Sequence, residues 1–320
     1  MHIADRVYVF RVGRLRKSRT RPVHASPTTT DASAVADRPP APAGTVPSPS
    51  APGRGAADRV AAAVLHRLRR WGGMVALAGA VARALVRPPF AWRREYVIAC
   101  IELLRSSFWP IAISVAVFGF SGPGLQAGNF LEAFGSTDRS GGFLVVAIVR
   151  EFGTFVTAAV VAGVVGTMLA AELGTRRVRG EIDALEALGV EPVAAIVAPR
   201  TLALVTMLMV LDVFALVAGV AGGYVASVVV LDGSSGAFVA SFMSNVTFLD
   251  LLGSVVKVGI FGLLIGIVCS WHGLRAEGGA HGVGRAVNRA VVGSLLAIFV
   301  VNLVYTQWFL ATFPEVNVLR

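Results

Sequence analysis

Charged residues are scarce in this chain. Asp, Glu, Lys and Arg make up 15% of its 320 residues, whereas 55% are hydrophobic, and the mean hydropathy is +0.70. So low a charge content argues against a soluble domain and predicts an integral membrane protein. Lysine occurs only at Lys17 and Lys257, and neither lies in a GxxxxGK[ST] loop, so the sequence contains no ATP-binding P-loop.

Cysteine and histidine are also too few and too widely spaced to predict a site. Cys100 and Cys269 lie in apolar surroundings without CxxC or Cys/His spacing, which predicts a packing role. The five histidines are scattered and no HExxH motif occurs, so we expect neither a metal site nor catalytic residues. The N-terminus lacks an apolar segment with a small-residue cleavage site, so we expect no secretory signal peptide.

The charges that are present gather in the N-terminal third. Residues 1–105 carry 18 Lys and Arg against 6 Asp and Glu. This excess is typical of a cytoplasmic tail drawn to anionic lipid. Nucleic-acid binding is disfavoured, because aromatic residues at a spacing suited to base stacking are missing. Residues 1–57, rich in Arg and then in Pro, Ala, Ser and Thr, are predicted to be disordered. Residues 58–105 alternate Arg with apolar residues and tryptophan, which predicts interfacial amphipathic helices.

Five longer apolar segments follow, and each meets the roughly 20 residues needed to cross a bilayer. They lie near 107–127, 142–171, 198–230, 253–271 and 290–312. Loops 172–197 and 272–289 contain six Arg, whereas loops 128–141 and 231–252 contain one Arg against four acidic residues. The positive-inside rule then predicts a cytoplasmic-membrane protein with its N-terminus inside and its C-terminus outside. The predicted fold class is an all-α integral membrane protein.

Small residues recur within the second, third and fourth predicted spans. In lipid, such residues let helix backbones approach closely, and this packing largely replaces the hydrophobic drive. We expect packing between helices of the same chain, with a dimer face as the alternative. The residues concerned are Gly163, Gly166, Gly174, Gly219, Gly223, Gly262 and Gly266.

The segment 178–188, VRGEIDALEAL, predicts a short amphipathic helix between the second and third spans. Val178, Ile182, Leu185 and Leu188 recur at helical spacing, acidic residues occupy the remaining surface, and Gly189 follows as a stop. Eleven residues do not form a stable helix alone, so this helix must dock onto something. Its carboxylates disfavour an anionic membrane surface and favour a basic groove of a protein.

This helix lies within a block that carries a resemblance. The block contains Arg150-Glu151, Gly153, Ala162-Gly163, Gly166, Ala171-Glu172-Leu173-Gly174, Glu181-Ile182-Asp183-Ala184-Leu185, Gly189-Val190, Pro192 and Pro199-Arg200. It resembles the signature of MlaE/YrbE permeases, the membrane subunits of lipid-transporting ABC systems that work with MCE-domain proteins. The resemblance covers about residues 88–315. Three positions depart from it: Thr154 replaces a frequent Pro, Val164 a frequent Arg, and Gly180 a frequent Glu. Gly180 inside the helix costs about 1 kcal/mol relative to Ala.

The resemblance implies a permease domain over 58–320, which moves lipids or other hydrophobic molecules together with MCE-domain proteins on the outer side. A separate cytoplasmic ABC ATPase would use ATP and Mg²⁺, so the chain itself would bind no cofactor and would not be an enzyme. Phospholipid, fatty or mycolic acid and sterol remain open as cargo, as do import and export. A second permease of the same type is implied. Val164 favours the actinobacterial YrbE branch, in which two different permeases pair, over a homodimer.

The resemblance also assigns roles to individual residues. The helix 178–188 would be the coupling helix, seated in a groove of the ATPase. Residues expected at that interface are Glu181, Asp183, Glu186, Arg176, Arg177 and Arg179, with the membrane headgroups as the alternative contact of the three arginines.

Several polar residues fall within the predicted spans, where they usually face the bundle interior or a wet cavity. Arg150, Glu151 and Asp212 are candidates for the lipid path. Structural pairing with another span is the alternative, and for Asp212 and Asn302 an interhelical hydrogen bond is favoured. Lys257 begins the fourth span, and we expect it to reach the outer interface near Asp250.

Two other functions compete with this interpretation. The string Gly233-Ser234-Ser235-Gly236 matches the GxSG motif of rhomboid-type proteases, but it falls in an outer loop, whereas His272 and His281 are predicted inside. A nucleophile and its base must come within hydrogen-bond reach, so this intramembrane hydrolase is disfavoured. A permease of a small-solute importer also has an acidic coupling helix; its partner would be a solute-binding protein.

Overall fold

The computed structural model describes residues 72–86 and 92–313, so the predicted disordered tail 1–57 lies outside the described residues. Within these ranges every regular element is helical. Five helical rods are long and apolar enough to cross a membrane, which confirms the five predicted spans. The rods are Arg93–Ala133, Thr137–Val178, Val193–Val230, Phe248–Gly273 and Gly279–Thr312.

Each of the first three rods combines α-helix with short π-helical segments, and the second also begins with a 3₁₀ turn. The first contains α2 (Arg93–Gly119), η1 (Phe120–Gln126) and α3 (Ala127–Ala133). The second contains η2 (Thr137–Arg139), α4 (Ser140–Leu144), η3 (Val145–Phe152) and α5 (Gly153–Val178). The third contains η4 (Val193–Val197), α7 (Ala198–Tyr224) and η5 (Val225–Val230). The last two are the single helices α9 (Phe248–Gly273) and α10 (Gly279–Thr312).

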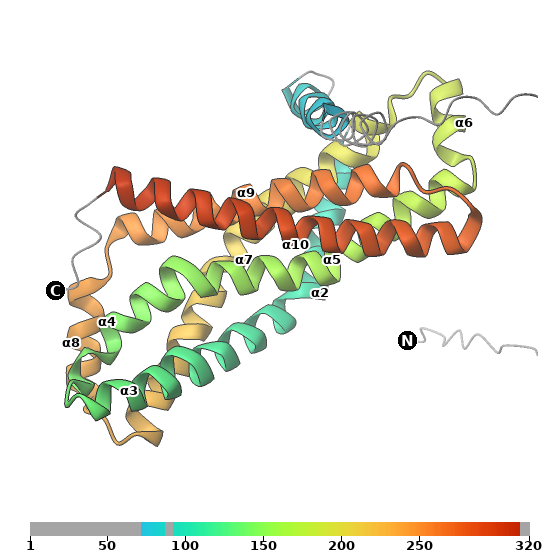
Figure 1. Ribbon diagram of the computed structural model, residues 1–320. Helices are drawn as coiled ribbons and strands as arrows, with labels where there is room; N and C mark the ends of the chain where they lie inside the picture. Colours follow the sequence, from blue (N-terminus) through green and yellow to red (C-terminus); the bar gives the residue numbers. More distant parts are fainter. Residues whose placement is uncertain (1–71, 87–91, 314–320) are drawn as a thin grey trace, which may run out of the picture. The chain divides into compact units, whose positions relative to one another are not determined.

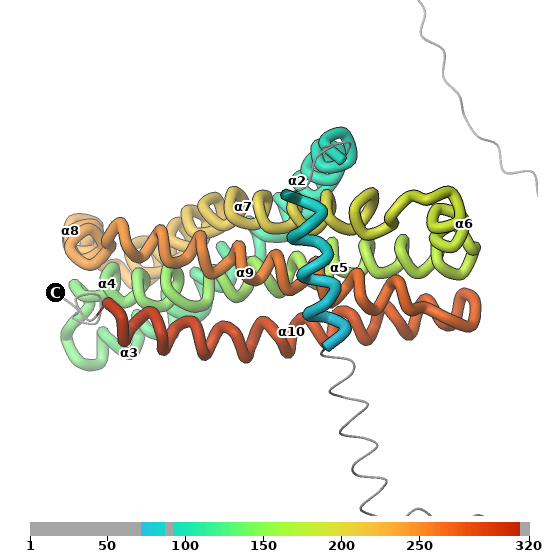
Figure 2. Tube along the Cα trace, turned by 90° about the horizontal axis from the view of Figure 1, so that it is seen from above, coloured from blue at the N-terminus to red at the C-terminus, as the bar shows by residue number. Residues whose placement is uncertain are grey.

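The rods lie side by side and leave short elements at both ends. The helix α6 (Glu181–Ala187) lies at one end, together with the turn between α9 and α10 (Figure 1). At the opposite end lie α3, α4, the C-terminal end of α10 and α8 (Ser235–Asn245). The short helix Gly72–Val86 crosses over the rods (Figure 2), where Leu77 packs against Ile267 and Trp271 of α9. The loops predicted on opposite sides of the membrane therefore lie at opposite ends of the bundle.

One predicted boundary differs from the structure. The sequence predicts an interfacial helix over residues 91–105 and a first span that begins at residue 107. In the structure α2 begins at Arg93 and continues unbroken through that point. The stretch from 93 to 109 has no Gly or Pro to end a helix, and Tyr96 already bonds to α7 through a 3.0 Å contact between its hydroxyl and Thr206 Oγ1. The polar start of this rod therefore belongs to the same continuous helix as its apolar part.

The glycines predicted to pack do so within this chain, with one exception. A Cβ added at Gly219 would come within 2.9 Å of Ile148 and Val115, and one at Gly262 within 2.8 Å of the Leu204 carbonyl oxygen. Added Cβ atoms at Gly166, Gly174, Gly223 and Gly266 also meet neighbours at 3.2 Å or less. Gly163 is exposed and has nothing within 4 Å of that position. Close approach explains the other six, but it does not explain Gly163.

Candidate functional site

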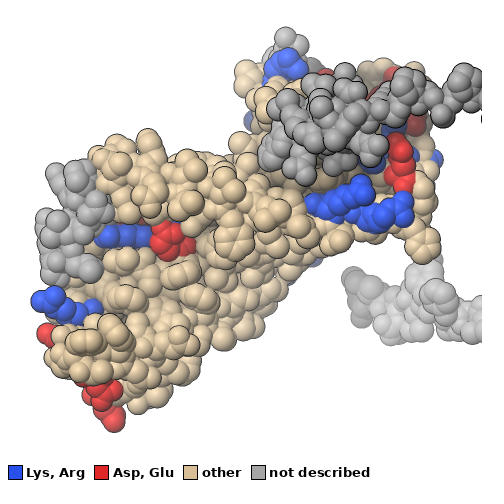
Figure 3. All heavy atoms as spheres, in the orientation of Figure 1, with Lys and Arg blue, Asp and Glu red and all other residues tan. Residues whose placement is uncertain are grey.

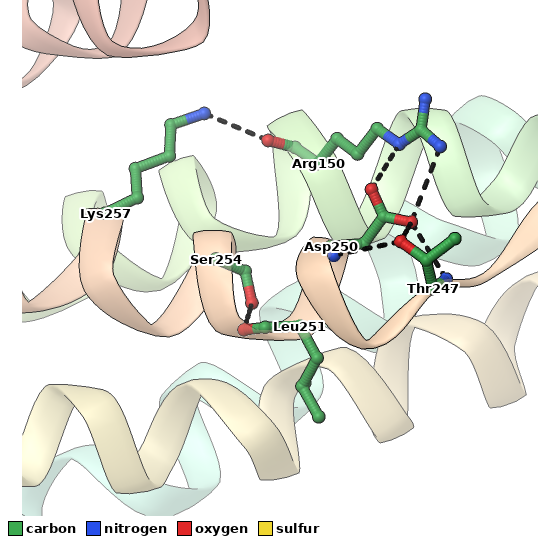
Figure 4. Close-up of polar contacts among 6 residues, drawn as sticks. All are labelled: Arg150, Thr247, Asp250, Leu251, Ser254 and Lys257. Carbon is green, nitrogen blue, oxygen red and sulfur yellow. Dashed lines mark hydrogen bonds and ion pairs between the residues drawn. The ribbon is translucent and has the colours of Figure 1, made fainter. Parts of the chain in front are cut away.

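A network of buried charged groups joins the second rod to α9 and α10. It begins on η3, a π-helical turn that presents the adjacent residues Arg150 and Glu151 to different partners. The guanidinium of Arg150 donates from Nε to Asp250 Oδ1 at 2.8 Å and from Nη2 to Oδ2 at 3.5 Å (Figure 4). The Asp250 side chain is fully buried. This pairing explains how Arg150 is accommodated within a span.

Asp250 also caps the N-terminus of α9. Its Oδ2 accepts hydrogen bonds from the backbone N–H and the hydroxyl of Thr247, at 2.9 and 2.8 Å. The Asp250 N–H donates in return to Thr247 Oγ1 at 3.3 Å, which completes a capping box. The same carboxylate therefore begins α9 and neutralises Arg150; it accepts four of these hydrogen bonds, and the backbone N–H of Asp250 donates the fifth.

Lys257 lies two turns further along α9 on the same side, and its side chain is only 2% exposed. Its Nζ donates to the carbonyl oxygen of Arg150 at 2.9 Å, to Thr306 Oγ1 at 3.0 Å and to Glu151 Oε2 at 3.4 Å. The prediction that Lys257 reaches the outer interface near Asp250 is wrong. Asp250 is already paired with Arg150, and three acceptors inside the bundle use all three ammonium hydrogens.

Glu151 completes the network. Its Oε2 also accepts a 3.0 Å hydrogen bond from Asn302 Nδ2 on α10, which confirms the interhelical role predicted for Asn302. Arg150 and Glu151 thus both pair with other helices, as the structural alternative proposed. Sequence reasoning placed neither Asp250 nor Lys257 in this site. The signal was present, because residues seven apart lie on the same face of a helix.

The network borders a cavity of about 210 Å³. All four charged residues line it, together with Ser254, Tyr305 and Thr306 and the apolar side chains Val146, Phe309 and Leu310. Elsewhere charged residues gather toward the two ends of the molecule, and the long face between them carries few (Figure 3). A cavity lined by both charged and apolar groups has the chemistry to accept an amphiphile.

The helix α6 lies at the other end of the bundle. It is shorter than the predicted 178–188, because Val178 ends α5 and Gly180 precedes the first residue of α6. Gly180 has φ +75°, a left-handed conformation that costs other residues about 1–2 kcal/mol. The predicted cost of Gly180 inside a helix is therefore wrong, since this glycine forms the turn that starts α6. Ile182 is buried in the core, and Leu185 packs against the same cluster.

The charged residues of this end fall into two groups. Asp183 forms a short ion pair with Arg177, and Arg179 Nη1 lies 3.7 Å from Glu181 Oε1. Among the described residues no ion pair is found for Glu186, which is exposed. Leu188, just beyond α6, is 78% exposed. Within the chain the arginines thus neutralise two of the three predicted coupling carboxylates, and Glu186 and Leu188 project outward.

Below α6, Glu172 links the ends of α5 and α7. Its Oε1 accepts from Arg176 Nη2 at 2.8 Å and from Arg200 Nη2 at 2.6 Å, and its Oε2 forms a short bond with Arg200 Nη1. Arg176 lies one turn along the same helix, whereas Arg200 belongs to α7. Arg176 therefore pairs with Glu172 within α5, and Arg200 supplies the link to α7; the contact of Arg176 with an ATPase or with headgroups stays a prediction.

The remaining residues named in the sequence analysis lie in different parts of the bundle. Asp212 on α7 is fully buried, between α5 and α9. Ser234, part of the predicted GxSG string, begins α8 and accepts a hydrogen bond from the Ala237 N–H. His272 is near the end of α9, at the opposite end of the bundle from α8 (Figure 1). The structure therefore does not bring this serine and histidine together. Both cysteines are buried, as predicted.

Comparison with known proteins shows which family and which sequences this chain resembles. Residues 97–308 match the family described as Permease MlaE. A probable ABC transporter permease protein of Rickettsia felis is 32% identical over 233 residues, which is 72% of this chain and 88% of that protein. One from Synechocystis is 37% identical over 203 residues, covering 62% and 76%. Protein TRIGALACTOSYLDIACYLGLYCEROL 1 of Arabidopsis thaliana is 30% identical over 237 residues, covering 73% and 66%.

Proposed function

The chain belongs to the MlaE permease family and is a multi-pass ABC transporter permease, and we propose that its cargo is a lipid or a similar amphiphile. The observation that carries the proposal is the cavity of about 210 Å³ between η3, α9 and α10. Its charged lining residues suit a polar headgroup, and Phe309 and Leu310 suit an acyl chain or a ring system. The name of the Arabidopsis relative refers to a galactolipid, which supports the same class.

Membership of an ABC permease family implies a partner ATPase, and we assign α6 as the helix that contacts it. Glu186 in α6 and Leu188 just beyond it project outward. An exposed leucine close to a carboxylate suits a groove with an apolar floor and a basic rim. Ile182 anchors the inner side of α6 in the bundle core. The ion pairs of Glu172 tie α5 to α7, so a force applied to α6 acts on both spans together.

The other partners follow from the same assignment. With α6 in the cytoplasm, α3, α4 and α8 lie on the outer side, where MCE-domain proteins would dock. A second permease would complete the transporter. The exposed Gly163 and its neighbour Val164 offer a surface for close helix contact, and we favour a different permease there over a second copy. The protein would reside in the cytoplasmic membrane.

A pull-down in mild detergent from the native membrane tests these assignments. The tagged wild type is compared with Glu181→Lys/Glu186→Lys and with Glu132→Lys, a matched charge reversal on an exposed residue of α3 at the opposite end. Proteins and lipids are both identified by mass spectrometry. We expect the ATPase, MCE-domain proteins and a lipid with the wild type, and loss of the ATPase alone in the α6 variant. The α3 variant is expected to keep the ATPase.

Two outcomes would contradict the proposal. If the intact wild-type protein recovers neither an ATPase nor MCE-domain proteins, the assignment of α6 and of the outer partners fails. If a solute-binding protein is recovered in place of MCE-domain proteins, and no lipid, the chain serves a small-solute importer. Mass spectrometry of the intact complex also shows whether the second permease has the same sequence or a different one.

A further inference from the structure

Asp212 is a fully buried acidic residue within a candidate span, and the network above does not use it. It stands at the midpoint of the rod Val193–Val230, and its side chain is fully buried. Among the described residues neither of its carboxyl oxygens has a hydrogen bond of normal geometry. A buried carboxylate without donors is very costly, so the surroundings of Asp212 must satisfy it in another way.

The groups that face Asp212 have no hydrogens left to donate. They are the hydroxyls of Ser254 on α9 and Thr157 on α5, with the ammonium of Lys257 nearby. The Ser254 hydroxyl donates to the Leu251 carbonyl at 2.8 Å, and the Thr157 hydroxyl donates to the Gly153 carbonyl at 2.9 Å. A hydroxyl has one hydrogen and two lone pairs, so both hydroxyls can still accept but not donate. The three hydrogens of Lys257 are likewise engaged by other acceptors.

The charge balance leads to the same conclusion. In the network, the two cations Arg150 and Lys257 are matched by the two anions Glu151 and Asp250. An ionised Asp212 would be a third anion without a matching cation. The first rod supplies none, because α2 has no charged residue from 106 to 119. That stretch lies level with Asp212, since the ring of Phe108 is 6.0 Å from that of Phe214 on α7.

We propose that Asp212 is a proton-binding site of the membrane domain. Its carboxyl group carries the proton and donates it to the free lone pair of the Ser254 or Thr157 hydroxyl. The bond ties α7 to α9 or to α5, and the interior then has no net charge. Ser254 and Lys257 also line the cavity of about 210 Å³, so two of the groups that face Asp212 border that cavity. A rearrangement that parts α7 from α5 and α9 would wet the carboxyl group and release the proton.

Infrared spectroscopy of the purified protein in lipid at neutral pH tests this proposal directly. A protonated carboxyl has a C=O stretching band well separated from the bands of a carboxylate and of the amides. We expect such a band in the wild type, a shift when aspartate is labelled with ¹³C in its side-chain carboxyl, and loss of the band in Asp212→Asn. The absence of any label-sensitive band of this kind would overturn the proposal, and so would a band that is unchanged in Asp212→Asn.

The isotope label is read on the wild type, so the absence of a label-sensitive band overturns the proposal even where the variant does not fold, whereas Asp212→Asn assigns a band to Asp212. A second readout is stability. Asn is uncharged and can donate to the same hydroxyls, so Asp212→Asn is expected to unfold within about 2 °C of the wild type at neutral pH, a difference of less than about 1 kcal/mol. A clear fall of the midpoint would mean that an ionised Asp212 is held by Lys257. Neither readout depends on the identity of the cargo or of the ATPase.

Discussion

Glu151 and Lys257 form an ion pair whose two side chains differ in exposure. Because of this difference, removing one charge is expected to lower the free energy of unfolding more than removing the other. The Glu151 side chain is 28% exposed toward the cavity, whereas that of Lys257 is 2% exposed. Glu151→Gln leaves a buried ammonium without a counter-ion, because an amide oxygen can accept a hydrogen bond but carries no charge. Leaving a buried charge without its counter-ion costs about 3–5 kcal/mol, which is roughly a hundredfold or more in the folding equilibrium.

Lys257→Met has a smaller expected cost. The remaining carboxylate keeps its bond from Asn302 and reaches the cavity, so we expect a loss of about 1–3 kcal/mol. The double variant Glu151→Gln/Lys257→Met removes both charges and keeps the side-chain volumes. It is expected to lose no more than Lys257→Met alone, which corresponds to a coupling energy of at least about 3 kcal/mol.

Unfolding of the purified protein by SDS titration in mixed micelles measures all three variants. Glu132→Gln on α3 serves as the control, because this exposed carboxylate has no ion pair among the described residues and its loss is expected to fall within about 0.5 kcal/mol of zero. Losses that simply add in the double variant would refute the pairing. A greater loss for Lys257→Met than for Glu151→Gln would refute the argument from exposure.

Two further predictions concern glycines. A Cβ at Gly222 would lie 2.2 Å from the Ala116 carbonyl oxygen, so Gly222→Ala should push α7 away from α2 and lower the free energy of unfolding by about 1–3 kcal/mol in the same titration. Gly163→Ala, with nothing within 4 Å, is the matched control and should leave it unchanged or raise it by up to about 1 kcal/mol; an equal loss in both would refute the packing argument. Gly180→Ala should weaken ATPase recovery by up to about tenfold, because its left-handed turn starts α6, whereas Gly180→Asn should weaken it less. Equal recovery with both Gly180 variants and wild type would show that the turn does not position α6.

Much of the fold follows from the composition of the chain. A bilayer requires about 20 apolar residues per crossing, and only five segments after residue 105 meet that length without a charge-rich interruption. The short helix α6 was also predictable, because Ile182 and Leu185 recur at helical spacing and Gly189 follows. Its start was misplaced by three residues, since Gly180 in the left-handed region and Gly180 inside a helix look alike in sequence.

The candidate site was predictable only in part. Arg150 and Glu151 stood out, because ionisable residues within an apolar span are rarely there without a function or a partner. Their partners did not stand out. Asp250 and Lys257 lie a hundred residues away near the start of another span, where a local interpretation favours a helix cap and an interfacial lysine. Such a local interpretation describes Asp250 correctly as a cap but misses its ion pair.

The sequence by itself determined that this protein crosses a membrane five times, that a short acidic helix separates the second and third spans, and that the chain belongs to the permease family it resembles. These properties depend on residues close together in the chain, through apolar length, helical period and a local motif. Only the tertiary structure decided which charges neutralise one another, because burial and distance between helices set that choice. Tertiary packing also buries Asp212 beside Ser254 and Thr157, whose hydroxyls already donate to backbone carbonyls.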